Sequence, residues 1–158
     1  MNVRLIDTSI MLNLLEVPKR CNDKDQVQEE LKKALQDNDT LILPVATIIE
    51  TGNAIAQISG NKRHDIAEKF ALYLSKTAEG NAPWSCDSTE VAREDLLYYA
   101  NNYISSADAG VGMGDLSIIR TYEKCKESLV VGRIMIWSTD EHLSSYQESE
   151  VFKTRRKA

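Results

Sequence analysis

Short apolar segments alternate with longer helical segments from one end of this chain to the other. Residues 3–6, 40–43 and 129–137 have the length and flanking residues of strands, and residues 84–86 form a weaker strand candidate. Strands separated by helices are joined by right-handed crossovers, which give a mostly parallel sheet covered by helices on both faces. The alternation therefore predicts an α/β fold.

The segments between these strands have the apolar periodicity of helices. Pro44 suits the start of a helix, because its fixed φ and missing N–H cost little there. A glycine-containing loop is expected at residues 107–114. Helices are expected at residues 8–16, 24–36, 44–58, 62–76, 89–104, 115–126 and 141–146.

The length of 158 residues is typical of one domain. No repeat or long linker divides the chain, so we expect a single domain over residues 1–150 and a basic tail at 151–158. No apolar run approaches the ~20 residues of a membrane helix, and the first residues lack a signal-peptide pattern, which favours a cytoplasmic protein without a membrane partner. Three widely spaced cysteines, Cys21, Cys86 and Cys125, predict reduced thiols and neither a disulfide framework nor a zinc site.

Four acidic residues stand at or near the joints where predicted strands meet helices. Asp7 follows the first strand, Glu50 lies in the helix after the second, Asp115 opens a helix after the glycine loop, and Asp140 follows the last strand. Ligands of open α/β sheets bind beyond the carboxyl ends of the strands, so the fold could gather these acids at one edge. Clustered carboxylates repel one another unless a cation neutralises them, and their hard oxygens suit Mg²⁺ or Mn²⁺. Such ions can activate water and stabilise both oxygens of an in-line phosphoryl displacement.

Each of these acids also has a purely structural interpretation. Asp7 and Asp140 precede predicted helices and are suited to cap them. Asp115 lies on the apolar face of its helix, where it either needs a partner or interacts with the helix N-terminal dipole. Glu50 lies outside the apolar stripe of its own helix and has the periodicity of a solvated residue. That stripe comprises Val45, Ile48, Ile49, Gly52, Ile55 and Ala56.

Around the four acids the sequence resembles the PIN-domain nucleases, and in particular the small VapC-type toxins of prokaryotic toxin–antitoxin pairs. The matching segments are LIDTSIMLNLL, LPVATIIETGNA, GMGDLSII and IMIWSTDEHL, which occur in the family's order and span nearly the whole chain. Each segment alone is weakly specific, whereas all four in order are fairly specific. The chain is longer than the smallest members, and we assign the extra length to residues 76–88.

The resemblance implies a three-layer α/β/α sandwich with a central, mostly parallel sheet. It also implies a metal-dependent endoribonuclease that hydrolyses RNA phosphodiester bonds with Mg²⁺ or Mn²⁺. Asp7, Glu50, Asp115 and Asp140 would be its catalytic and metal-binding residues. The implied partners are an RNA substrate, an antitoxin protein and a second copy of the chain in a homodimer.

Several neighbouring hydroxyl groups are candidates to orient the acids. The family carries a hydroxyl two residues before its last acid, and Ser138 takes that place here. Thr8, Ser138 and Thr139 are therefore expected to orient a carboxylate or a water molecule, although helix capping is the simpler role for Thr139.

The formal net charge of −5 gives the chain no general attraction for RNA phosphates, so RNA binding needs local positive charge or metal ions. Tyr98, Tyr99 and Tyr103 could stack on RNA bases, although core packing is the better interpretation of at least two of them. His64 and His142 are expected at the surface, since no histidine base is required. The basic candidates are Lys62, Arg63, Arg120, Arg155 and Arg156, with Lys153 and Lys157 in the same tail.

Two other functions stay open at this point. A PIN-fold module that binds RNA or protein with little or no catalysis would keep the acids as caps. A phosphatase of the haloacid-dehalogenase type would use Asp7 as a covalent nucleophile, but that family needs a second aspartate where this chain has Ser9. A dinucleotide site is excluded, because Gly110, Gly112 and Gly114 lack the G-x-G-x-x-G spacing.

Overall fold

The computed structural model describes residues 2–86, 92–128, 131–146 and 149–152 of the chain. In this part of the chain, five strands form one sheet in the order β3-β2-β1-β4-β5. Strands β1 to β4 are parallel to their neighbours, and β5 runs antiparallel beside β4. The strands are β1 (Asn2–Ile6), β2 (Thr40–Leu43), β3 (Trp84–Cys86), β4 (Val131–Trp137) and β5 (Ser149–Phe152).

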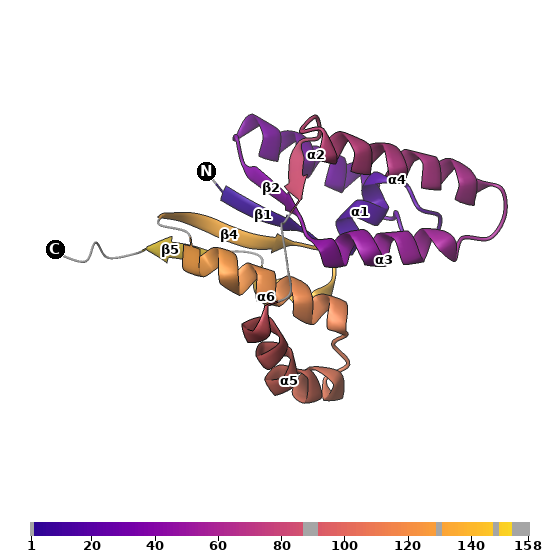
Figure 1. Cartoon of the computed structure of the whole chain (residues 1–158). Coiled ribbons are helices and arrows are strands. Elements are labelled where there is room, and N and C mark those ends of the chain that lie inside the picture. The colour runs from indigo at the N-terminus through magenta and orange to yellow at the C-terminus, as the bar shows by residue number, and fades with distance from the viewer. Residues whose placement is uncertain (1, 87–91, 129–130, 147–148, 153–158) are drawn as a thin grey trace.

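Helices cover both faces of this sheet (Figure 1). Helices α1 to α4 lie on one face, whereas α6 lies along the other face and α5 packs against α6. The predicted fold class, a three-layer α/β/α sandwich with a central, mostly parallel sheet, is confirmed. The helices are α1 (Thr8–Leu14), α2 (Lys24–Gln36), α3 (Val45–Ala56), α4 (Lys62–Ala78), α5 (Arg93–Asp108), α6 (Met113–Ser128) and the short 3₁₀ helix η1 (Glu141–Tyr146).

The alternation of side chains along the strands divides the apolar core between the two faces. Ile6 and Trp137 belong to the cluster beneath α1 to α4, whereas Leu5 and Ile136 belong to the cluster beneath α6 and η1. All four side chains are buried. Successive residues of a strand point to opposite faces, so a sheet with both faces covered needs apolar residues at consecutive positions.

The strand ends and helix starts at the carboxyl edge of the sheet are tied together by hydrogen bonds. The backbone N–H of Asp7 donates to the carbonyl oxygen of Trp137 at 3.0 Å, which extends the pairing of β1 and β4 by one residue. The Thr47 hydroxyl donates to the carbonyl oxygen of Ile6 at 2.7 Å and docks the first turn of α3 onto the end of β1. Helix α3 contacts both α1 and α6, so it borders this edge from the side (Figure 1).

The structure corrects the predicted boundaries near the glycine loop. Helix α5 runs from Arg93 to Asp108, about four residues later than predicted, and the predicted start at residues 89–91 lies outside the described residues. Helix α6 begins at Met113, so Asp115 lies inside its first turn and does not open it. The sequence does not predict β5, which crosses the expected boundary between domain and tail and ends at Phe152. Residues 153–158 of that tail lie outside the described residues.

The predicted apolar stripe of α3 is only partly correct, because Ile55 is buried and Ile48 packs against the core, whereas Ile49 and Ala56 are exposed. The buried residues of this helix are Thr47, Thr51 and Ile55, and the side chain of Ile49 is 58% exposed. The Thr47 hydroxyl docks α3 on the end of β1. This polar contact, and not the apolar periodicity of the helix, determines which face of α3 is buried. Among the helices within the described ranges, none is long and apolar enough to cross a membrane.

Candidate functional site

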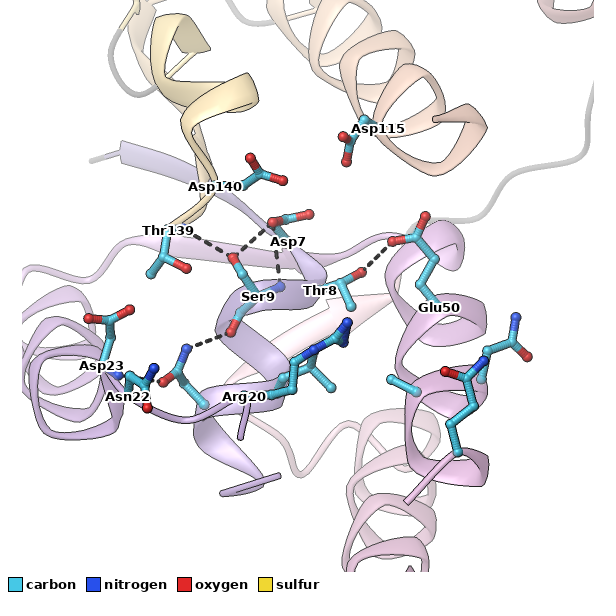
Figure 2. Close-up of a pocket in the computed structure, with 15 residues that line it drawn as sticks. Asp7, Thr8, Ser9, Arg20, Asn22, Asp23, Glu50, Asp115, Thr139 and Asp140 are labelled. Atoms are coloured by element: carbon cyan, nitrogen blue, oxygen red, sulfur yellow. Dashed lines mark hydrogen bonds between the residues drawn. The ribbon is translucent and has the colours of Figure 1, made fainter. Parts of the chain in front are cut away.

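A polar pocket of about 520 Å³ lies at the carboxyl edge of the sheet. All four predicted acids line it, although 43, 65 and 25 positions separate them in sequence. Figure 2 shows the carboxylates of Asp7, Glu50, Asp115 and Asp140 arranged around one opening. Among the described residues, the pocket is also lined by a fifth carboxylate, Asp23, and by a single guanidinium, that of Arg20. We call this site the acidic pocket.

The Asp7 carboxylate is held through one of its two oxygens. One of its oxygens, Oδ2, accepts hydrogen bonds from the Ser138 hydroxyl at 2.7 Å and from the Ser9 hydroxyl at 2.9 Å. The same oxygen accepts the backbone N–H of Ser9 at 3.4 Å, so Asp7 does cap α1, but through its longest bond. No described residue donates a hydrogen bond to the other oxygen, Oδ1. The carboxylate is therefore fixed through one oxygen while the other is left for a ligand.

Ser9 and Ser138 join the ends of β1 and β4. The two hydroxyls lie 3.3 Å apart, and Ser9 also accepts the backbone N–H of Thr139 at 3.0 Å. Ser138 accepts the backbone N–H of Asp140 at 2.9 Å, which fixes the chain at the start of η1. The Thr139 side chain lines the pocket, and its expected orienting role stays a prediction.

Glu50 reaches the pocket from α3. Its Oε2 accepts the Thr8 hydroxyl at 2.8 Å, so Thr8 orients a carboxylate as predicted from the sequence (Figure 2). Glu50 is half-buried, which corrects its expected place on a solvated face. Its position follows from the docking of α3 through Thr47, one turn earlier in the helix.

Asp115 and Asp140 line the pocket from the first turn of α6 and from the residue before η1. Asp115 is half-buried in the first turn of α6, where the helix dipole favours a negative charge. Asp140 is half-buried and immediately precedes η1, whose Leu143 donates its backbone N–H to the Asp140 carbonyl at 3.1 Å. Each therefore combines a place near a helix N-terminus with a place in the pocket.

Sequence reasoning missed most residues that line the pocket beyond the four acids and the expected Thr8 and Thr139. Asn13 is buried in α1, donates to the Ser9 carbonyl at 2.8 Å and accepts the Asp23 backbone N–H at 3.0 Å. It thereby holds the segment that carries Arg20 and Asp23 against the pocket. A polar residue inside the apolar run IMLNLL was the available signal for Asn13. No comparable signal marks Arg20, which lies in an irregular segment between α1 and α2.

The chemistry of the donors fits a hard divalent cation. The pocket offers carboxylate, hydroxyl and amide oxygens, and no cysteine or histidine side chain that the structure describes lines it. Oxygen donors of this kind suit Mg²⁺ or Mn²⁺. Within the described ranges, no three acidic, histidine or cysteine side chains are close enough to form a ready-made metal site. Mg²⁺ is usually held by one or two carboxylates together with several waters, so the wide spacing is compatible with such an ion.

Among the basic residues expected to bind RNA, those that the structure describes do not line the acidic pocket. Lys62 and Arg63 are exposed at the start of α4. Arg120 pairs with Asp95 at 3.0 Å and lies over the ring of Tyr98 at 4.9 Å. Arg155 and Arg156, together with the rest of the basic tail, lie outside the described residues.

The aromatic candidates, and the one histidine candidate whose side chain the structure describes, also lie outside the acidic pocket. Tyr98 and Tyr99 pack edge to face on α5, Tyr99 lines the neighbouring cavity, and Tyr103 is 45% exposed. His64 is exposed and pairs with Glu68 at 3.0 Å, as expected for a surface residue. The side chain of His142 lies outside what the structure describes.

Beside the acidic pocket lies a second cavity of about 520 Å³, which we call the apolar cavity. Glu50 lines both cavities and forms part of the wall between them. Ile49, Leu96 and Met113 line the apolar cavity and are about half exposed, at 58%, 59% and 46%.

A buried charge cluster also lines the apolar cavity and joins α5 to α6. Asp95 Oδ1 contacts Lys124 Nζ at 2.7 Å and Arg120 Nε at 3.0 Å. Its Oδ2 accepts the backbone N–H of Ala92 at 2.9 Å. The hydrogen bond from Lys124, followed by that of the Ala92 backbone, lowers the pKa of Asp95 to about 2.

No model of a known protein family matches this chain, and no curated protein sequence matches it. The resemblance to PIN-domain nucleases therefore rests on the four sequence segments, with a fold that is consistent with a PIN-like sandwich.

Proposed function

We propose that this protein is a metal-dependent endoribonuclease of the PIN type that hydrolyses RNA phosphodiester bonds in the acidic pocket. One observation carries the proposal. Asp7 is held through Oδ2 by Ser9 and Ser138, and its Oδ1 is left for a ligand in a pocket shared with the three other acids. Pure helix capping does not require that three further acids, from three other elements, line the same pocket.

The charge of the pocket supports a requirement for divalent cations. Five carboxylates and one guanidinium line it, so a phosphodiester would be repelled unless cations neutralise the site. Asp7, Asp115 and Asp140 would hold the main ion, and Glu50 would complete the site directly or through water. When bound, Mg²⁺ or Mn²⁺ supplies positive charge to the phosphoryl oxygens and lowers the pKa of water.

The side chains around the acids would orient them for this chemistry. Ser138 and Ser9 fix Asp7, and Thr8 fixes Glu50. Arg20 is the cation best placed to contact a substrate phosphate, because it lines the pocket. Lys62 and Arg63 would contact the RNA farther from the cleaved bond, whereas Arg120 is engaged by Asp95. This assignment replaces Arg120 with Arg20 among the candidates for RNA binding.

The biological setting follows from the resemblance. We propose a cytoplasmic toxin of a toxin–antitoxin pair, which would act on cellular RNA and be restrained by an antitoxin. The exposed apolar side chains of α5, Leu96, Leu97 and Ile104, support a protein partner or a homodimer. A catalytically silent module remains the second candidate, since the described acids do not form a ready-made metal site.

RNA cleavage tests the proposal. Purified protein is incubated with a mixture of structured RNAs in Mg²⁺, in Mn²⁺ and in EDTA, beside the variants Asp7→Asn and Asp115→Asn. We expect cleavage by the wild type with metal only, and a loss of about 100-fold or more in both variants.

Asp65→Asn is the matched control. Asp65, like Asp115, lies in the first turn of a helix, but it is exposed on α4 outside the acidic pocket. The control should cleave RNA like the wild type. Equal cleavage by the wild type and Asp7→Asn would contradict the site assignment, and a folded wild type that neither binds metal nor cleaves RNA would favour the silent module.

A further inference from the structure

Gly114 lies where α6 passes the wall between the acidic pocket and the apolar cavity. It lines the apolar cavity together with Glu50 and directly precedes Asp115. A Cβ added to Gly114 would coincide with the carboxylate of Glu50. The backbone of α6 at Gly114 therefore lies so close to the Glu50 carboxylate that no side chain fits between them.

The absence of a side chain at Gly114 is not required by its backbone. Its φ lies outside the left-handed region, unlike those of Gly60, Gly80 and Gly110. Alanine is the better helix former, so helix propensity alone would favour alanine at this place in α6. The constraint on residue 114 comes from the neighbouring carboxylate.

The group that an alanine would meet is the end of a flexible side chain. The fold can therefore accept a methyl group at residue 114 if the Glu50 carboxylate turns away. Turning away would break the hydrogen bond of 2.8 Å from Thr8 and withdraw the carboxylate from its place beside Asp115. Glu50 is thus held from two sides, by the Thr8 hydroxyl of α1 and by the bare backbone of α6.

We propose that Gly114 is a positioning residue, which keeps the Glu50 carboxylate in the acidic pocket by presenting no side chain to it. The inference rests on the proposed function, because the proposed function assigns Glu50 its role in metal binding. It adds a residue without any donor atom to that site. It also predicts that substitution of Gly114 weakens metal binding without destabilising the fold.

The test is a titration of the metal-free protein with Mn²⁺, followed by calorimetry, beside thermal unfolding in EDTA. Gly114→Ala should weaken Mn²⁺ binding by about tenfold to 100-fold, the range typical of residues that orient metal ligands. In EDTA its melting temperature should equal or exceed that of the wild type, because alanine favours the helix. Gly112→Ala is the matched control, since a Cβ there meets no atom within 4 Å, and it should bind Mn²⁺ like the wild type.

A double-mutant cycle shows whether Gly114 acts through Glu50. In a Glu50→Ala background there is no carboxylate to displace, so adding Gly114→Ala should leave Mn²⁺ affinity unchanged within about twofold. Equal loss in both backgrounds would overturn the inference, as would a Gly114→Ala protein that binds Mn²⁺ like the wild type or melts several degrees lower in EDTA. A wild type that binds no Mn²⁺ would instead contradict the proposed function and remove the basis of the inference.

Discussion

The two oxygens of the Asp7 carboxylate differ in the hydrogen bonds that they accept. Oδ2 receives the bonds that hold the end of β1 against the start of α1 and the end of β4. Oδ1 receives none from the described residues. The capping interpretation of Asp7 is therefore correct and incomplete, because a cap needs only the Ser9 backbone bond, which is the longest of the three at 3.4 Å.

Replacing Ser138 by alanine tests whether the hydroxyl bonds to Oδ2 orient Asp7 for a ligand. Ser138→Ala removes the shortest bond to Asp7 and the acceptor of the Asp140 backbone N–H. We expect Mn²⁺ affinity to fall about tenfold to 100-fold and the free energy of unfolding in EDTA to fall by about 1 kcal/mol. Ser145→Ala, an exposed serine of η1, serves as the control in both measurements. Unchanged Mn²⁺ affinity in Ser138→Ala would show that Asp7 does not depend on this hydroxyl.

At the scale of elements, a buried carboxylate links α5 to α6. Asp95 of α5 contacts Arg120 and Lys124 of α6, and only 4% of its side chain is exposed. Because α6 also carries Gly114 and Asp115, this attachment supports the helix that borders the acidic pocket.

The Asp95 cluster predicts how stability changes in acid. The pKa of the Asp95 carboxyl is about 2 in the folded chain, below its ordinary value of 3.8. The charged carboxylate therefore stabilises the fold fully above about pH 5, and this contribution is lost as the pH falls from there toward about 2. Asp95→Asn should be less stable than the wild type at pH 6, and the difference should shrink toward pH 3. Urea unfolding at a series of pH values measures this difference in the free energy of unfolding. The exposed Glu94→Gln of the same helical turn should track the wild type, and a gap that stays constant for Asp95→Asn would refute the assignment.

Most elements of the fold could be predicted from the sequence because strongly apolar short segments and long periodic segments specify them. The predictions fail where contacts between distant segments determine the local structure. Helix α3 buries Thr47 and exposes Ile49, since a hydroxyl docks it on the end of β1. Strand β5, with the sequence SEVF, is too short and too polar to be recognised before β4 provides its partner.

The four acids of the candidate site and the hydroxyl groups beside them could be named from the sequence, but the other residues that line it could not. Asp7, Glu50, Asp115 and Asp140 stand at recognisable joints, and the structure places them in one pocket. Arg20 and the contact between Gly114 and Glu50 depend on how distant segments pack, which no local pattern encodes. The contact of Arg120 with Asp95 was unpredictable for the same reason, because the two residues lie 25 positions apart in different helices.

At the scale of the whole molecule, the parallel sheet explains why acids from distant segments meet. Parallel strands end at a common edge, and the helices that follow begin there. This edge accumulates carboxylates in a chain whose net charge is already −5. Such an arrangement can bind a polyanion only with the help of cations, so the central claim is that the acidic pocket holds a divalent metal.

X-ray diffraction at the manganese absorption edge, from crystals of the protein grown with Mn²⁺, tests that claim most directly. The account predicts an anomalous peak in the acidic pocket, at about 2 Å from Asp7 Oδ1 and within reach of Asp115 and Asp140, directly or through water. Crystals of Asp7→Asn should lack the peak. A peak at another surface, or no peak at saturating Mn²⁺, would contradict the account.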